Sequence, residues 1–389
     1  MTFVVRCGTL FDGTGSDPVE NAELVVVDGK IAAGPAPAGA EVVDLSSAFV
    51  LPGLVDAHTH LSIVPSRGDQ GGQILQDAGR QALRVPDNLR ADFRAGTTTM
   101  RIMGEEDWLD VHTRDAIAAD EIEGPNLVIS TRGLAPTDGH GLGKQAFDGV
   151  EGVHRGAREN LVHGADFIKV FATGGVSSGT GLERSSYSLE ELRAAVDEAE
   201  RAGTYVAAHA HGGPGLRTSV EAGVRTIEHG AVASDEEVEA MLAAGCWLVA
   251  TFSILFHPDG IERGDGGNPR ILDNLKRARE RVSERMETIL SSGLRIALGT
   301  DSMHGQMAYE VQTAVRFGMS PKDALLAATA RGAEALCVAS HKGTLEPGKD
   351  ADLIAIEGNP LRDPSALERV VFVMKGGTQV PGRFGIFDP

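Results

Sequence analysis

The sequence predicts an α/β fold, a (β/α)8 TIM barrel joined to a small β-sandwich. From position 49 onward, eight short apolar runs rich in β-branched residues alternate with segments of helical periodicity, which predicts the barrel. Both chain ends consist instead of strand-like runs and turns, which predicts the sandwich. We therefore expect a composite β-sandwich domain of residues 1–48 plus 343–389 and a barrel domain of residues 49–342.

Eight successive strand–helix units favour a closed barrel over an open doubly wound sheet. No Gly-x-Gly-x-x-Gly opens the first helix, which further disfavours a dinucleotide-binding sheet. The expected barrel strands are 49–57, 97–103, 126–130, 166–171, 204–210, 225–230, 247–253 and 295–301.

Two of the intervening helices carry clear end signals. Ser188 and Glu191 form a capping box at the start of a helix over 188–203. The segment 234–245 repeats this pattern, with acidic residues in its first turn and Gly245 at its end. These signals support helices between the predicted strands.

Three long glycine-rich segments follow predicted strands, at 61–73, 173–187 and 254–270. In a barrel such segments lie at the rim where active sites form, so we expect them to act as gates. Near the N-terminus, Asp28-Gly29 lies within LVVVDGK and predicts a β-hairpin.

Composition limits the class of protein. The 389-residue chain is 42% hydrophobic and has 36 basic against 55 acidic residues, for a net charge of -19. This charge disfavours nucleic acid or an anionic membrane as partner. The three cysteines have no paired spacing, and no signal segment or long apolar run is present. We expect a cytoplasmic protein that acts on a small molecule.

The stretch LPGLVDAHTH, residues 51–60, ends the first predicted barrel strand with two histidines. Side chains two positions apart on a strand point the same way, so His58 and His60 should converge. Convergent histidines suggest a bound cation, whereas the alternative is a pair of surface loop histidines.

Further ionisable residues end other predicted strands: Lys169, His209 with His211, His229 and Asp301. Neutral imidazoles and carboxylates form the usual shell of a zinc-like ion. A buried lysine is costly unless neutralised, and carbamylation by carbon dioxide converts it into a carboxylate able to bridge two cations. The alternatives are core histidines with satisfied hydrogen bonds and a solvent-facing edge lysine.

The ordered motifs LPGLVDAHTH, FIKV, AHAHG, IEHG and GTD, with the tail GTLEPGKDADLI, resemble those of the amidohydrolase superfamily. They are most similar to its imidazolonepropionase-like branch, which includes Xaa-Pro dipeptidases (prolidase-like enzymes), zinc carboxypeptidases, ochratoxin-type amidases and arylurea hydrolases. The resemblance covers nearly the whole chain, so it implies the same barrel and a hydrolytic activity.

The resemblance also implies roles for individual residues. Two divalent metal ions, most simply Zn²⁺, would occupy the rim, with a hydroxide between them as nucleophile. Asp301 would pass the water's proton to the leaving amine. Relatives often form homo-oligomers, which we also expect here. The implied metal ligands are His58, His60 and Asp301 for one ion, His209 and His229 for the second, and a carbamylated Lys169 bridging both.

Three further residues are candidates for substrate binding. His140 matches a glycine-flanked histidine that in this branch touches the substrate's carbonyl oxygen, although Asp138 replaces the family's first glycine. An ordinary loop histidine is the alternative for His140. His211 shares a strand face with His209, and many relatives carry tyrosine there. Tyr187 is either a substrate contact or a packing residue before a helix.

The predicted activity is metal-dependent hydrolysis of a carbon–nitrogen amide bond, in an N-acyl amino acid or dipeptide. Hydrolysis of aryl amides, carbamates or ureas, including ochratoxin-type amides, is the alternative. For a substrate carboxylate, the loops offer Arg67, Lys144 and Arg184 as possible partners.

Two other functions remain as alternatives. A cyclic-amide hydrolase or deaminase could use the same scaffold, but mononuclear deaminases place a glutamate shortly after the histidine of strand five and lack Lys169. A non-enzymatic relative is disfavoured, because every ligand position is retained.

Overall fold

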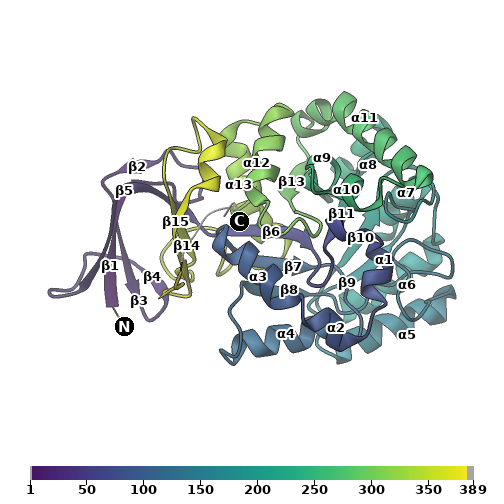
Figure 1. The fold of residues 1–389 in the computed structure, drawn as a ribbon, viewed down its shortest axis with the longest axis horizontal. Coiled ribbons are helices and arrows are strands. Elements are labelled where there is room, and N and C mark those ends of the chain that lie inside the picture. Colours follow the sequence, from purple (N-terminus) through teal and green to yellow (C-terminus); the bar gives the residue numbers. More distant parts are fainter. Residues whose placement is uncertain (1, 383–389) are drawn as a thin grey trace.

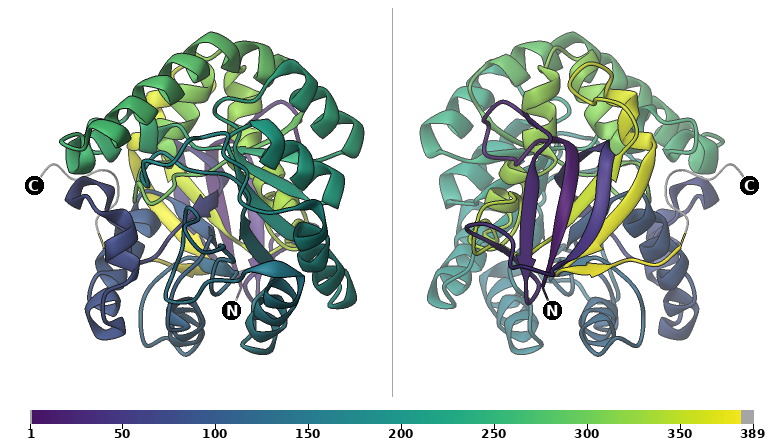
Figure 2. Two further views of the ribbon diagram at one scale, coloured as in Figure 1. Left: turned by 90° about the vertical axis from the view of Figure 1, so that its right-hand side faces the viewer. Right: turned by 90° about the vertical axis from the view of Figure 1, so that its left-hand side faces the viewer.

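Eight parallel strands form the barrel, and a helix or group of helices follows each strand around the outside (Figures 1 and 2). The computed structural model describes residues 2–382. The barrel strands are β6 (Leu54–Thr59), β7 (Thr97–Ile102), β8 (Asn126–Ile129), β9 (Ile168–Phe171), β10 (Val206–Ala210), β11 (Thr226–His229), β12 (Trp247–Ala250) and β13 (Arg295–Leu298).

Pairing within the barrel is continuous in two groups, β6 to β8 and β9 to β13. A parallel bridge between Leu134 and Val170 connects the first group to the second. At the other seam, the backbone N–H of Asp301 donates to the carbonyl of His58 at 2.7 Å. The Asp56 carboxylate reinforces this seam by accepting from the backbone N–H of Thr300 at 3.0 Å. The predicted barrel is confirmed.

Amphipathic helices cover the barrel. Both predicted capping boxes are present, at Ser188 and Ser234. The helices that follow the first five strands are α1 (Gln70–Ile74), α2 (Ala78–Ala82), α3 (Val85–Arg94), α4 (Leu109–Ala118), α5 (Gly149–Val162), α6 (Leu189–Arg201) and α7 (Gly213–Ala222). The remaining helices are α8 (Asp235–Ala244), α9 (Ser253–Phe256), α10 (Ile261–Asp265), α11 (Pro269–Ser291), α12 (Met307–Arg316), α13 (Pro321–Ala327) and α14 (Ala330–Ala335).

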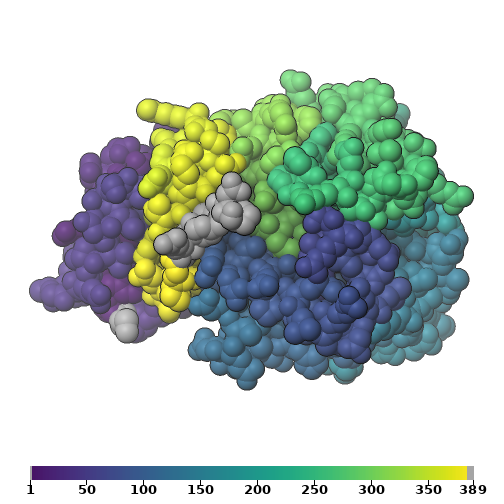
Figure 3. Space-filling model, in the orientation of Figure 1, coloured from purple at the N-terminus to yellow at the C-terminus, as the bar shows by residue number. Residues whose placement is uncertain are grey.

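The two chain ends pair with each other beside the barrel, as predicted (Figure 3). Their strands form one hydrogen-bonded sheet that surrounds its own apolar core, in which Phe3 and Val26 lie with Leu353 and Phe372. The strands are β1 (Thr2–Leu10), β2 (Val19–Glu20), β3 (Glu23–Val27), β4 (Lys30–Ala32), β5 (Glu41–Pro52), β14 (Leu353–Ile356), β15 (Val370–Lys375) and β16 (Thr378–Gln379).

Several predicted boundaries need correction. The expected strand 49–57 is two strands, because β5 continues to Pro52 in the sandwich and β6 begins at Leu54 in the barrel. The division between the sandwich and barrel domains after residue 48 remains a prediction. Residues 383–389 of the predicted sandwich domain lie outside the described part. The segments 61–73 and 254–270 are not simple loops, since they include a 3-10 turn (η1, Pro65–Arg67) with α1, and α9 with α10. A second 3-10 turn, η2, spans Pro364–Glu368.

None of the helices within residues 2–382 is long and apolar enough to cross a membrane.

Inside the barrel, a buried polar contact joins β7 to β11. The guanidinium of Arg101 is fully buried and donates to Glu228 at 2.8 Å, to Thr226 at 3.1 Å and to the carbonyl of Ala57 at 2.7 Å. Thr226 and Glu228 are two residues apart, so both side chains face the same side of their strand.

We expect Arg101→Met to lower the free energy of unfolding by about 3 kcal/mol or more, because it leaves the buried Glu228 carboxylate without its cation. Arg90→Met is the control, since the Arg90–Asp87 pair is exposed and should contribute less than about 1 kcal/mol. Urea unfolding of the metal-free protein measures both changes. Equal losses in the two variants would contradict the structural role of Arg101.

Candidate active site

His58 and His60 lie at the end of β6 and line a cavity at the carboxyl ends of the barrel strands. The Oδ1 atom of Asp301, which follows β13, lies 3.5 Å from His58 Nε2 and 3.8 Å from His60 Nε2. One possible ligand atom from each of these three residues lies within 4.8 Å of the others. The structure therefore brings together the three residues expected to hold one ion.

The outer hydrogen bonds of these rings determine which nitrogen is free. The Nδ1 atom of His58 contacts a carboxylate oxygen of Glu228 at 2.7 Å, and Nδ1 of His60 contacts the carbonyl of Gly104 at 2.9 Å. Both acceptors require a proton on Nδ1, which leaves the Nε2 lone pair of each ring facing Asp301. This is the tautomer that a metal ligand needs.

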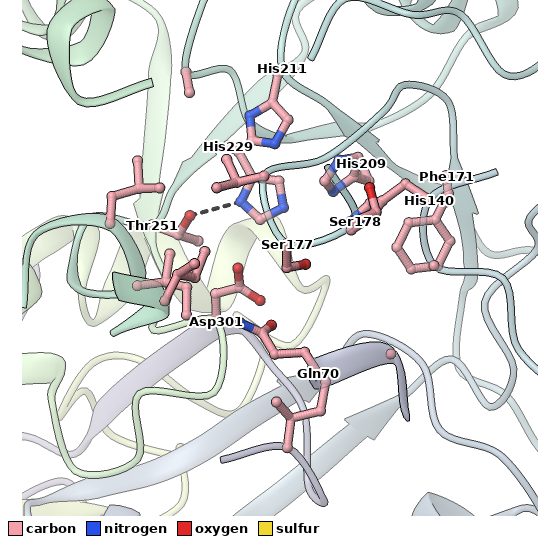
Figure 4. Close-up of a pocket in the computed structure, with 18 of the residues that line it drawn as sticks. Gln70, His140, Phe171, Ser177, Ser178, His209, His211, His229, Thr251 and Asp301 are labelled. Carbon is pink, nitrogen blue, oxygen red and sulfur yellow. Dashed lines mark hydrogen bonds between the residues drawn. The ribbon is translucent and has the colours of Figure 1, made fainter. Parts of the chain in front are cut away.

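His209 and His229 lie across the cavity from Asp301, with ring centroids 4.7 Å apart (Figure 4). His229 Nδ1 contacts the hydroxyl of Thr251 at 2.7 Å, so its Nε2 atom is free. The partner of His209 Nε2 is the carbonyl of Gly174 at 3.1 Å, so its Nδ1 atom is free. Each ring thus keeps one nitrogen available on the cavity side.

Backbone conformation marks the same positions. His229 and Asp301 have φ of 74° and 50°, in the left-handed region of backbone conformation that residues other than glycine rarely adopt. Such strained residues persist where the surrounding structure holds them, and they cluster at active sites. Here they turn two candidate ligands into the cavity at the ends of β11 and β13.

Lys169, on β9, is fully buried and lines the same cavity. Its Nζ atom has no hydrogen-bond partner within the described chain. Burial lowers the pKa of Lys169 to about 8, against the opposing effect of Glu228 and Asp301. The lowered pKa gives this amine a larger neutral, nucleophilic fraction near neutral pH than an exposed lysine has.

Burial also sets the charge of the histidines. It lowers the pKa of His60 to about 4 and that of His140 and His211 to about 3. The pKa values of His58, His209 and His229 are likewise far below the usual value, with burial as the largest cause. Neutral imidazoles can donate lone pairs, so the cluster is suited to bind cations.

His140 and His211 both line the cavity, and each has an Nδ1 atom that is buried without a hydrogen-bond partner. His140 lies 4.4 Å from His209 between ring centroids, and His211 lies 5.1 Å from His229. Asp138, which replaces the family's glycine, has φ of 61° and pairs with Arg184 at 3.1 Å. Aspartate tolerates this left-handed conformation, so the loop keeps a turn there without the glycine.

Tyr187 does not lie at this site. Its side chain packs in the apolar core, and its hydroxyl donates to the carbonyl of Phe147 at 3.0 Å. Tyr187 is not among the described residues that line the cavity, so the structure gives it a packing position instead of the expected substrate contact.

We expect Tyr187→Phe to lower the free energy of unfolding by about 1 kcal/mol, because the buried carbonyl of Phe147 loses its donor. The same variant should leave kcat/KM unchanged. Urea unfolding and steady-state kinetics measure the two effects. A loss of kcat/KM at unchanged stability would instead support a substrate contact by Tyr187.

The cavity has a volume of about 510 Å³ and is large enough for a small molecule. The segments 61–73 and 254–270 meet at this cavity, where the N–H of Asp69 donates to Asp265 at 2.8 Å. Asn274 of α11 donates to the carbonyl of Thr180, in the segment 173–187, at 2.6 Å. Apolar side chains make up much of its wall, among them Ile74, Phe171, Val176, Ile254, Leu255 and Ile271.

The three basic residues suggested by the sequence do not line this cavity. Lys144 pairs with Asp107, and Arg184 pairs with Asp138. Arg67 lines two smaller hollows outside it. Within the described residues, none of these three cations is therefore placed to pair with a substrate carboxylate in the cavity.

Sequence reasoning missed the residues that orient the histidines. Glu228 of β11 contacts His58 of β6, and Thr251, which follows β12, contacts His229 of β11. A signal existed for Glu228, because a charged residue within the buried run TIEH calls for a buried partner. Gln70 also lines the cavity and was not singled out.

Comparisons with known proteins agree with this geometry. A model of the amidohydrolase family matches residues 49–380. Ochratoxinase of Aspergillus niger is 31% identical, covering 97% of this chain and 86% of that protein. Imidazolonepropionase of Salinispora arenicola is 28% identical, covering 89% of this chain and 88% of that protein.

A crystal structure of a Xaa-Pro dipeptidase with bound methionine in its active site is 28% identical and superposes with a TM-score of 0.90, covering 98% of this chain and 100% of that chain. The fold, the ordered motifs and the matched family model point to one conclusion. The chain belongs to the amidohydrolase family and is a hydrolase that acts on carbon–nitrogen bonds.

Proposed function

We propose that this enzyme hydrolyses a small amide with two divalent metal ions, most simply zinc, bound around a carbamylated Lys169. One observation carries the proposal. Four neutral histidines and one carboxylate each turn a free ligand atom toward a single cavity that also contains a buried, unpartnered lysine amine. These residues are His58, His60, His209, His229 and Asp301.

The residues present fit such a pair of ions. Nitrogen and oxygen donors are those that zinc prefers, and the tautomers set by Glu228, Gly104, Thr251 and Gly174 leave one nitrogen free on each ring. Carbamylation would give the buried Lys169 amine the negative charge and oxygen atoms that two neighbouring cations need.

The chain's own residues then supply orientation and proton transfer. When bound, the ions would supply Lewis acidity that lowers the pKa of a water molecule and polarises a carbonyl. Asp301 accepts a proton from the attacking water, whose oxygen bonds to the acyl carbon. The carbon–nitrogen bond breaks, and the leaving amine takes that proton from Asp301. His140 contacts the carbonyl oxygen of the substrate from the cavity wall.

Two substrate classes suit this chemistry. N-acyl amino acids or dipeptides are favoured by the similarity to the Xaa-Pro dipeptidase. Neutral aryl amides, carbamates or ureas are favoured by the cavity itself, because Arg67, Lys144 and Arg184 do not line it.

The test is a screen of zinc-reconstituted enzyme against N-acyl amino acids, dipeptides, aryl amides, carbamates and ureas, with metal content measured for each preparation. We expect two ions per chain, hydrolysis of at least one class, loss of activity on chelation and recovery with zinc. Full activity after removal of the metal would refute the proposal, as would a fully metallated enzyme that cleaves none of these bonds.

A further inference from the structure

Two glutamines on helix α1, Gln70 and Gln73, have opposite environments. The amide of Gln73 accepts from Val64 N at 2.9 Å and donates to the carbonyls of Val64 at 3.1 Å and Gly68 at 2.7 Å. The Nε2 atom of Gln70 has no hydrogen-bond partner within the described chain, although the residue is only 9% exposed. Gln73 therefore holds the segment together, whereas Gln70 has a buried donor to spare.

The unpartnered amide of Gln70 points into the cavity, on the side of Asp301 (Figure 4). Its position is well supported, because Asp69 caps α1 by accepting from Gly72 N at 3.1 Å and donates its own N–H to Asp265 at 2.8 Å. Buried donors nearly always have a partner in native structures. A substrate is the partner that this location offers.

Charge around Gln70 indicates what kind of substrate group this is. Asp69 and Asp265 line the cavity beside it, and Oδ2 of Asp265 is buried without a donor. The proposed ions would be held by the histidines, Lys169 and Asp301 and would face the scissile carbonyl, and no arginine or second lysine is among the described lining residues to pair with a further anionic group. An incoming carboxylate would lose its hydration and meet two like charges, which is unfavourable.

A neutral group avoids this cost and matches the free atoms. A carboxamide, urea or carbamate has a carbonyl oxygen that accepts from Gln70 Nε2, and its N–H groups suit the free carboxylate oxygen of Asp265. The apolar wall accommodates hydrocarbon on the remainder of the molecule.

We propose that Gln70 determines substrate specificity by donating from Nε2 to an uncharged oxygen of the substrate, so that the enzyme prefers neutral amides to substrates with a free carboxylate. This inference rests on the proposed amide hydrolysis and narrows its substrate class. Gln70 acts by binding the substrate, so its effect should appear in KM more than in kcat.

The test compares two substrates that differ only in charge, N-hexanoyl-para-aminobenzamide and N-hexanoyl-para-aminobenzoate. Zinc-loaded enzyme is assayed for release of the aromatic amine from each. Zinc-free protein, which cannot turn them over, is used to measure the Kd of both compounds by calorimetry. Wild-type enzyme should show a kcat/KM at least about tenfold higher for the benzamide, because the benzoate carboxylate must lose its hydration beside Asp69 and Asp265.

Three variants localise the effect. Gln70→Leu should raise KM for the benzamide by about tenfold with little change in kcat. Gln70→Arg should raise kcat/KM for the benzoate, because a guanidinium pairs with its carboxylate. Gln76→Leu is the matched control, since Gln76 follows α1, contacts Arg84 at 2.6 Å and does not line the cavity. It should leave both substrates unchanged.

The possible results distinguish a failure of the Gln70 specificity from a failure of the proposed amide hydrolysis. Hydrolysis of the benzoate as fast as the benzamide, with KM unchanged in Gln70→Leu, overturns the specificity while amide hydrolysis stands. If the zinc-loaded enzyme cleaves neither compound, hydrolysis of such aryl amides fails and calorimetry decides on Gln70. Tighter binding of the benzamide that is lost in Gln70→Leu then supports the assignment, and equal binding of both compounds overturns it.

Discussion

Replacing Asp301 with asparagine should reduce kcat by about 10³-fold while leaving the fold and much of the metal affinity in place. The carboxylate lies 3.5 Å from His58 Nε2 and 3.8 Å from His60 Nε2, where it faces the same space as the proposed ions. Burial raises the pKa of Asp301 to about 6, which suits a group that takes up and releases a proton near neutral pH. An amide has no basic oxygen for this transfer.

Asparagine is a fair replacement because it preserves shape and backbone. Asp301 has φ of 50°, and asparagine is among the few residues that accept this conformation. Asp120→Asn is the matched control, since Asp120 also has a left-handed φ, of 56°, but lies after α4 and does not line the cavity. Its kcat should equal that of the wild type.

Steady-state kinetics, elemental analysis and circular dichroism of both variants test this expectation. A kcat near the wild-type value in Asp301→Asn with normal metal content would refute proton transfer by Asp301. A loss of metal in parallel with activity would instead assign Asp301 to metal binding alone.

The strand ends could be predicted because strand geometry is periodic. His58 and His60 lie two residues apart, and alternation alone places both side chains on one face. Once eight strands are taken as a barrel, their carboxyl ends form one rim, which brings Lys169, His229 and Asp301 into the same cavity.

Contacts between residues far apart in the sequence could not be predicted from strand periodicity. The Glu228 carboxylate orients His58 across the barrel, and the hydroxyl of Thr251, just after β12, orients His229. Gln70 lines the cavity on a segment that is held in place by the hydrogen bond from Asp69 to Asp265, a contact between residues far apart in the sequence. Tyr187 precedes a helix in either interpretation, and only the position of Phe147 shows that its hydroxyl is already bonded.

The first barrel strand shows a similar limit. The run FVLPGLVDA has no polar side chain before Asp56, so periodicity gives no sign that it changes from one sheet to another at Gly53. The reason is steric and non-local. A Cβ atom at Gly53 would lie 2.1 Å from Oγ1 of Thr98, so only glycine allows the chain to pass the neighbouring strand there.

Replacing Lys169 with alanine should remove about half of the bound metal and lower kcat by about 10³-fold or more, the scale expected when a group that positions an ion is lost. Lys169 is fully buried with an unpartnered Nζ, so its neutral amine can add carbon dioxide to form a carbamate. The truncation also leaves space in the cavity, so added acetate should restore part of the activity and acetamide should not.

Spectroscopy provides the direct measurement. Wild-type enzyme loaded with zinc in isotopically labelled bicarbonate should show a carbamate carbon signal by nuclear magnetic resonance, and Lys169→Ala should lack it. Lys342→Ala is the matched control, because Lys342 is also buried but its amine already forms ion pairs with Asp352 at 2.7 Å and Asp350 at 2.9 Å. That variant should retain the signal. An active enzyme with two ions and an unmodified Lys169 would rule out the bridging carbamate, and the four histidines with Asp301 would then have to hold both ions without it.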